Sequence, residues 1–202
     1  GKPPPMATWA FFCSTLTGMA LLPSLLFSRL GFGLKPADLG LNARGNPHRA
    51  VPHIGWLYAI ALVVVIPLVL QAGSDEAFIN KYPLWRGGIG RDSAITIGEL
   101  ISYELLYIVL FVGVEGFFRG VMLFGTERGL GAYALPLMCV PYVFSHFGKP
   151  ESETYGAILA GVALGWLALK HRSVWAGAGV HIAVALLMDG MALSARGVRI
   201  LW

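Results

Sequence analysis

Four ionisable side chains occur in strongly apolar parts of the sequence, where an unpaired charge is costly. They are Glu115, Arg119, His146 and His181. A carboxylate can take a proton from water and so create a nucleophile for a carbonyl group. An imidazole can orient that water, protonate a leaving amine or donate a hydrogen bond to a developing oxyanion. Together these residue types indicate hydrolysis, with Glu115 as the general base.

The spacing of these residues supports this interpretation. Glu115 and Arg119 are four residues apart, so on a helix they share one face and the guanidinium can hold the carboxylate in place. Glu104 precedes Glu115 by eleven residues and falls near the same face. Asp189 follows His181 by about two helical turns. Each feature also has a structural interpretation, since a Glu–Arg pair can be a neutral bridge and a histidine at a helix end can be interfacial.

Two other kinds of hydrolytic site are weaker alternatives. Ser145 directly precedes His146, but neighbouring helix positions point about 100° apart, and the sequence has no Gly-x-Ser-x-Gly. Zinc could be held by Glu115, His146 and His181, because two histidines and a carboxylate suit this metal. No His-Glu-x-x-His pattern supports such a site. We therefore expect no cofactor, with zinc as the alternative.

The elements that must position these residues follow from the composition. Of the 202 residues, 56% are hydrophobic and only 13% are charged. A soluble fold of this size cannot hide so much apolar surface. The sequence therefore predicts an all-α, polytopic integral membrane bundle of about six transmembrane helices, with residues 1–202 forming one membrane domain. The expected spans lie near residues 7–30, 53–71, 94–124, 133–147, 154–169 and 174–193.

The same composition excludes several classes of protein. The chain is too apolar for a disordered protein or an ordinary cytosolic enzyme, and two cysteines do not make a secreted disulfide scaffold. Basic residues form no stripe, so we expect no nucleic-acid partner. In the fifth span, Gly161 and Gly165 are four residues apart. This spacing predicts close packing against a helix of the same chain, with dimerisation through that face as the alternative.

Three short segments resemble the motifs of one protease family. Residues 114–120, Val-Glu-Gly-Phe-Phe-Arg-Gly, resemble the first motif of the CAAX protease and bacteriocin-processing (CPBP) family of intramembrane proteases. Residues 142–150, with Tyr142 four positions before His146, resemble the second motif, and residues 179–181, Gly-Val-His, resemble the third. The resemblance covers roughly residues 103–189, and the continuation after the second motif is similar to a bacterial branch of the family.

The chain departs from the family pattern at two positions. Val114 stands where the first motif usually has a further glutamate, the one usually assigned to activating water. Some bacterial members look similar, with a single glutamate like Glu115. Ala185 stands where the third motif usually has Asn or Asp. Asp189 lies about 80° around the helix from His181 and could instead pair with Arg196.

The resemblance implies a glutamate-dependent intramembrane endopeptidase that cleaves a membrane protein or a protein or peptide delivered to the membrane. Glu115 is expected to be the base and Arg119 to steady it, while His146 and His181 position water and stabilise the oxyanion. Expected supporting residues are Glu104, Tyr142, Glu153 and Asp189.

The alternative is a non-catalytic accessory or scaffold subunit of a larger membrane complex, which Val114 and Ala185 favour. The expected partners are the lipid bilayer, an unidentified protein or peptide substrate and, for the alternative, other membrane subunits. We expect the protein in the bacterial cytoplasmic membrane.

Overall fold

Helices account for nearly all of the secondary structure in the computed structural model, which describes residues 5–42, 55–87, 89 and 94–202. Long apolar runs with few helix-breaking residues favour helix over strand, because a helix satisfies its backbone hydrogen bonds within the segment. The elements are α1 (Met6–Phe32), α2 (Trp56–Ala72), α3 (Glu76–Lys81), β1 (Ala94–Thr96), α4 (Ile97–Glu115), the π-helix η1 (Gly116–Phe124), α5 (Gly125–Leu130), the 3₁₀ turn η2 (Gly131–Tyr133), α6 (Ala134–Phe144), α7 (Glu151–His171), α8 (Trp175–Ala195) and β2 (Arg199–Leu201).

Local signals set where the long helices begin and end. A capping box starts α4, since the Thr96 hydroxyl accepts from the backbone N–H of Glu99 and the Glu99 carboxylate accepts from the backbone N–H of Thr96. Gly33 ends α1 in the left-handed conformation, with φ 65°. Pro150 immediately precedes α7. It fixes the start of this helix because its ring is compatible with a helix start but not with a helix interior.

Four helical stretches within the described residues are long and apolar enough to cross a membrane. They are Met6–Phe32, Ile97–Phe144, Glu151–His171 and Trp175–Ala195, and α2 is a shorter apolar helix of 17 residues. The prediction of an all-α integral membrane bundle is therefore confirmed. Large apolar side chains on the outside of α1, such as Met19 at 73% exposure, suit contact with lipid.

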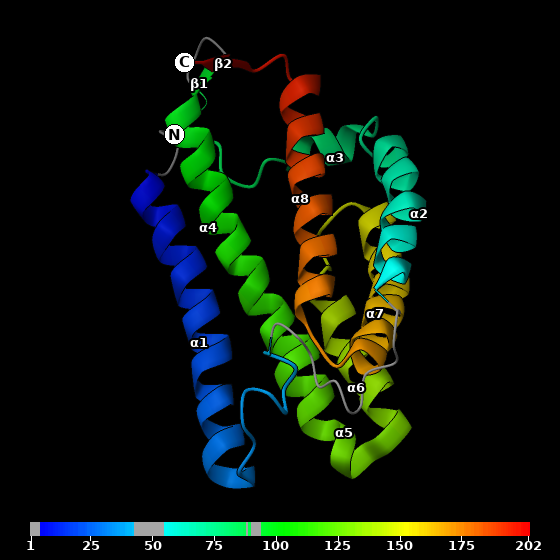
Figure 1. Cartoon of the computed structure of the whole chain (residues 1–202). Helices are drawn as coiled ribbons and strands as arrows, with labels where there is room; N and C mark the ends of the chain where they lie inside the picture. Colours follow the sequence, from blue (N-terminus) through cyan, green and yellow to red (C-terminus); the bar gives the residue numbers. More distant parts are fainter. Residues whose placement is uncertain (1–4, 43–54, 88, 90–93) are drawn as a thin grey trace.

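The predicted six spans and the observed helices differ in detail. The expected third and fourth spans largely overlap one helical stretch, Ile97–Phe144, that reverses direction through α5 and η2 (Figure 1). Helix α6 has 11 residues and a length of about 16 Å, about half the thickness of a hydrocarbon core. The second predicted span begins at residues 53 and 54, which lie outside the described residues.

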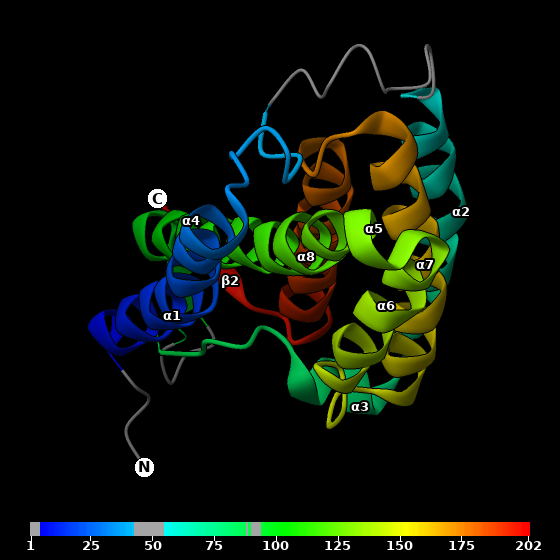
Figure 2. The same cartoon turned by 90° about the horizontal axis from the view of Figure 1, so that it is seen from below.

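Helix α8 occupies the middle of the bundle and connects its two sides (Figures 1 and 2). It packs against α4 on one side and against α2 and α7 on the other, while α1 lies along the outer side of α4. Strands β1 and β2 pair in parallel, with Ile95 opposite Ile200. This pairing joins the start of α4 to the segment that follows α8.

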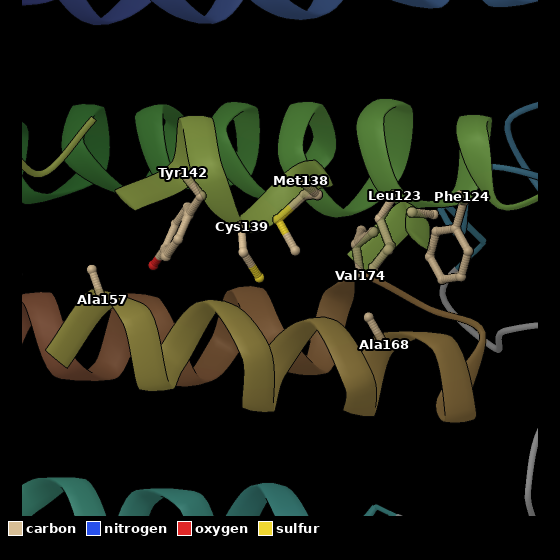
Figure 3. Close-up of a cluster of buried hydrophobic side chains, with 9 residues drawn as sticks. Leu123, Phe124, Met138, Cys139, Tyr142, Ala157, Ala168 and Val174 are labelled. Atoms are coloured by element: carbon tan, nitrogen blue, oxygen red, sulfur yellow. The ribbon is translucent and has the colours of Figure 1, made fainter. Parts of the chain in front are cut away.

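The packing of α6 against α7 depends on small residues (Figure 3). A Cβ added at Gly165 would lie 2.5 Å from Leu135 and 2.9 Å from Met138, and one at Gly161 would lie 3.0 Å from the Tyr142 ring. The predicted close packing within the chain is thus confirmed. Because Tyr142 belongs to this contact, the approach of the two helices also fixes an aromatic ring beside the site described next.

Candidate active site

The carboxylate of Glu115 lies where two helices meet, at the end of α4 and beside the second turn of α8. Its oxygen Oε1 accepts a hydrogen bond from Arg119 Nη1 at 2.9 Å and lies 2.8 Å from His181 Nδ1. The Glu115 side chain is 1% exposed and that of His181 is 14% exposed. The structure therefore brings three of the predicted residues into one buried cluster.

Glycines allow the segment that carries this cluster to pack closely against its neighbours. The change from α-helix to π-helix occurs directly after Glu115, between the two members of the ion pair. A Cβ added at Gly116 would lie 3.1 Å from Leu21 of α1, and one at Gly120 would lie 3.2 Å from the carbonyl oxygen of Leu39. π-helical turns are uncommon and frequently occur at functional sites.

Tyr142 covers the guanidinium and links the two predicted histidines. The Arg119 guanidinium carbon lies 4.0 Å from the centre of the Tyr142 ring, in a cation–π contact. The same ring lies 4.8 Å from the His146 ring and 6.3 Å from the His181 ring, centre to centre. Since these two distances add to 11.1 Å, the imidazole centres are no further apart than that.

The hydrogen-bond partners of the histidines define which ring nitrogen carries the proton. His146 Nδ1 lies 2.9 Å from the carbonyl oxygen of Tyr142, which can only accept, so Nδ1 is the protonated nitrogen. His181 Nδ1 faces a Glu115 carboxylate oxygen and donates in the same way. Burial, and then the charge of Lys149, lower the pKa of His146 from 6.5 to about 4. In the neutral His146 ring Nε2 is therefore an acceptor.

Three buried polar atoms in this cluster have no hydrogen-bond partner among the described residues. They are Glu115 Oε2 and the Nε and Nη2 atoms of Arg119. A Cβ added at Gly177 on α8 would lie 3.5 Å from Glu115 Oε2. The glycine therefore leaves space beside the oxygen that neither Arg119 nor His181 engages.

The predicted supporting acids Glu104 and Asp189 lie apart from this cluster, nearer the other ends of α4 and α8. Asp189 accepts a hydrogen bond of 2.5 Å from the Tyr103 hydroxyl. The alternative pairing of Asp189 with Arg196 is wrong, because Arg196 donates to the backbone carbonyls of Ile79 and Tyr82 instead. Arg196 follows the end of α8, where those carbonyls beside α3 are within its reach.

Glu153, the remaining supporting residue, stabilises the turn that carries His146. Its carboxylate accepts from the Tyr82 hydroxyl at 2.5 Å and from Lys149 Nζ at 2.6 Å. The Thr154 hydroxyl donates to the carbonyl oxygen of His146 at 2.9 Å. These contacts hold the turn between α6 and α7 from both the α3 side and the α7 side.

Ser145 and His146 are closer than helical geometry predicts. Ser145 Oγ lies 3.2 Å from His146 Nδ1, because α6 ends at Phe144 and the two residues no longer follow helical directions. The serine proton goes to the carbonyl oxygen of Tyr142 at 2.6 Å. His146 Nδ1 is itself protonated, so it cannot accept a proton from this hydroxyl.

Within the part of the chain that the structure describes, no three His, Cys, Asp or Glu side chains come close enough to hold a metal ion together. Glu115 Oε1 is already engaged by Arg119 and His181. The Arg119 guanidinium supplies positive charge beside this carboxylate.

Sequence reasoning missed residues that shape the cluster through packing. Phe111 lies 4.4 Å from His181, ring centre to ring centre. Phe111 precedes Glu115 by four residues, so helical spacing could have placed it on the same face. Gly177 left no such signal, because its proximity to Glu115 depends on how α4 and α8 pack.

Comparison with known proteins gives one match, to a family. Residues 97–187 match the family model described as "Type II CAAX prenyl endopeptidase Rce1-like". The match contains Glu115, Arg119, His146 and His181. Neither a curated protein nor a solved structure gives a significant match.

Proposed function

We propose that the chain is a glutamate-dependent intramembrane endopeptidase, because its residues 97–187 match the model of the Rce1-like family of CAAX prenyl endopeptidases. Its substrate is a membrane protein, or a protein or peptide delivered to the membrane. The protein is an integral membrane protein, and we place it in the bacterial cytoplasmic membrane because the segment after the second motif is similar to a bacterial branch.

The observation that carries this proposal is the unequal environment of the two Glu115 oxygens. Oε1 is held by Arg119 and His181, whereas Oε2 has no partner among the described residues and lies beside Gly177. A general base needs a fixed carboxylate with one oxygen free to reach the proton that it abstracts. Glu115 has both features, and its side chain is buried, so bulk water does not compete for the free carboxylate oxygen.

The reaction then proceeds by addition and elimination at the peptide carbonyl. A water oxygen attacks the carbonyl carbon while one water proton passes to Glu115 Oε2, and the carbonyl π electrons move onto oxygen. The carbon–nitrogen bond breaks as the carbonyl re-forms, and Glu115 returns the proton to the leaving nitrogen. The products are a new carboxyl group and a free amine, and Glu115 is regenerated.

The two histidines orient the reacting groups in this scheme. Their Nδ1–H groups are engaged by a backbone carbonyl and by Glu115, which fixes both rings, and Nε2 of the neutral His146 ring is an acceptor. An acceptor at Nε2 can hold the second proton of the attacking water, so that the oxygen lone pair faces the carbonyl carbon. The scheme uses no metal ion, since Arg119 supplies the positive charge beside Glu115.

A non-catalytic scaffold subunit is the second candidate function. It is favoured by Val114 and Ala185, two apolar residues at positions where the resembling motifs usually have polar ones. In this case Glu115, Arg119 and His181 would form a structural bridge between α4 and α8. The two candidate functions differ in the expected effect of a Glu115 substitution, because only an endopeptidase would lose cleavage.

The deciding experiment compares the wild-type protein with Glu115→Gln after reconstitution into liposomes. Both are incubated with a prenylated CAAX peptide and with candidate membrane proteins, and cleavage is followed by mass spectrometry. Gln keeps the shape and one acceptor but cannot take a proton from water, so we expect loss of cleavage in a variant that still folds. Its melting temperature should fall, because the buried Arg119 loses its anionic partner. Glu151→Gln, on the exposed first turn of α7, is the matched control and should cleave normally.

Full cleavage by Glu115→Gln would end the proposed mechanism, because the base would then lie elsewhere. A wild-type protein that cleaves none of the candidates and stays in a larger membrane complex would move the assignment to the scaffold. Val114→Glu in the same assay supplies the acid that the motif usually has, and a faster reaction in this variant would show that the site is competent.

A further inference from the structure

A cavity between α4 and α8 has no part in the proposed mechanism. It has a volume of about 360 Å³, at the lower end of the range for small-molecule sites. Glu104, on its wall, precedes Glu115 by eleven residues, or about 16 Å along α4, so the cavity lies near the helix ends that the β1–β2 pair joins (Figure 1). Most of the wall is formed by apolar side chains from α4, α8 and the segment after α8, namely Leu100, Leu186, Leu193, Val198 and Ile200.

Two carboxyl groups with unpartnered oxygens meet at this cavity. Oxygen Oε2 of Glu104 is buried and makes no hydrogen bond within the described part of the chain. Asp189 of α8 lies beside Glu104, because it accepts a hydrogen bond from the preceding residue, Tyr103, and its charge acts on Glu104. Asp189 is fully buried, its neighbour Gly190 is on the cavity wall, and its oxygen Oδ1 is also unpartnered.

The cations among the described residues do not balance these two acids. None of the ion pairs in that part of the chain includes Glu104 or Asp189. Arg196, which ends α8, donates to backbone carbonyls beside α3 instead. Acids at membrane depth are costly unless they face a partner, and the cavity provides the space for one.

The two free oxygens indicate the chemistry of the missing partner. They belong to different carboxyl groups on different helices, whereas a planar guanidinium pairs best with both oxygens of one carboxylate. A primary ammonium has three donors that point in different directions, so it can bond both groups at once. A quaternary ammonium has no N–H to donate. The apolar wall, in turn, suits an aliphatic chain.

We propose that this cavity binds a primary ammonium group that is attached to an aliphatic chain. The ammonium donates to Glu104 Oε2 and Asp189 Oδ1, and the chain lies against the leucines of the wall. Gly190, Ser194 and Ile200 on the wall are exposed, so a ligand can enter from outside. The inference does not depend on endopeptidase activity, because the cavity and the Glu115 cluster are separate.

The melting temperature of the purified protein in detergent, measured with added hexylamine, is the first test. Hexylammonium should raise the melting temperature until the site is saturated, because a ligand that binds only the folded state stabilises it. Hexyltrimethylammonium keeps the charge and the chain but has no N–H, and hexanol keeps the chain without the charge, so neither should give a saturable rise. An equal rise with hexylammonium and hexyltrimethylammonium would overturn the inference.

Glu104→Gln is the second test, because it keeps the shape of the side chain and removes its charge. The apparent Kd for hexylammonium should rise by about tenfold or more, as expected when a hydrogen bond to a charged group is lost. Glu99→Gln is the matched control: it makes the same charge change on an exposed turn of α4, and Gln can keep the capping box. Unchanged affinity in Glu104→Gln, or an equal loss in both variants, would contradict the proposal.

Photolabelling of the wild-type protein covers the case in which Glu104→Gln does not fold. An aliphatic amine with a diazirine in its chain should label the cavity wall in α4 and α8, as located by mass spectrometry, and excess hexylammonium should remove that label. Labelling confined to the exposed side of α1 would overturn the inference. The same experiment in nanodiscs separates two sources of the ammonium. Weaker labelling in phosphatidylethanolamine than in phosphatidylcholine identifies a lipid headgroup as the occupant, and equal labelling identifies a free amine.

Discussion

The two carboxylate oxygens of Glu115 show how little of a site depends on residue type alone. One oxygen is engaged twice and the other lies beside the backbone of α8, and both facts come from the contact between α4 and α8. Helical spacing could predict the bond from Glu115 to Arg119, because both residues are in one continuous helical stretch. The bond to His181 joins positions 66 residues apart, and no local pattern encodes it.

The first prediction concerns the stability that Arg119 provides. Arg119→Ala leaves the Glu115 carboxylate buried without its cation, so we expect a loss of about 3–5 kcal/mol in the free energy of unfolding. Unfolding in detergent followed by circular dichroism measures this loss. Arg128→Ala is the control: its pair with Asp38 is 58% and 32% exposed, and such a pair contributes about 0–1 kcal/mol. An Arg119→Ala protein that melts like the control would show that the buried pair is incidental.

The second prediction concerns the space beside Glu115 Oε2. Gly177→Ala adds a methyl group 3.5 Å from that oxygen, an ordinary contact that should leave folding intact and slow cleavage by displacing the attacking water. Gly179→Ala, on the same helix with open space at its Cβ position, is the matched control. Both variants should gain helix propensity, up to about 1 kcal/mol. Equal cleavage by the two would mean that the reacting water lies elsewhere.

At the scale of elements, apolar run length predicted the long helices well, because a lipid-facing helix needs little beyond length and composition. The turn through α5 and η2 falls in the gap between the expected third and fourth spans, which end at residue 124 and begin at residue 133. The π-helix η1 was not predicted. Helix α3 was missed because six residues are too few for a periodic signal. The predicted divergence of Ser145 and His146 failed for a related reason, as it assumed a helix beyond Phe144.

The third prediction concerns the packing of α6 on α7. Gly161→Leu forces a side chain against the Tyr142 ring, which a Cβ alone already approaches to 3.0 Å, and should move that ring from Arg119. We expect a loss of about 1–3 kcal/mol in unfolding free energy together with reduced cleavage. Gly156→Leu, with open space at its Cβ position on the same helix, should change neither quantity. If Gly156→Leu causes the larger loss, that face binds a partner helix and dimerisation regains support.

The stability of the whole molecule is coupled to proton binding at His146, in the turn between α6 and α7. The pKa of His146 is about 4 in the folded chain and near 6.5 in the unfolded chain, chiefly because of burial. The unfolded state therefore binds the proton more readily, so the contribution to stability is complete above pH 6.5 and is lost as the pH falls towards 4.

This linkage gives the fourth prediction. Between pH 7 and about pH 4, the melting temperature of the wild-type protein should fall more steeply than that of His146→Gln, which has no group to titrate there. If the melting temperatures of the two proteins fell equally across this pH range, a lowered His146 pKa would be contradicted. Lys149 also faces this imidazole, and Glu153 pairs with Lys149, so both are left unchanged in the comparison.

The β1–β2 pair has a mechanical consequence for the cluster at the other end of the bundle. It fastens the beginning of α4 to the segment after α8, whereas Glu115 ends α4 and His181 lies near the beginning of α8. A rigid tilt of α4 about this joined end would act over the length of its 19 residues, about 28 Å. A rotation of only about 5° about this end moves the far tip by about 2.4 Å over such a length. A displacement of this size would break the hydrogen bond between Glu115 and His181. The geometry of the cluster is therefore sensitive to a small tilt of α4.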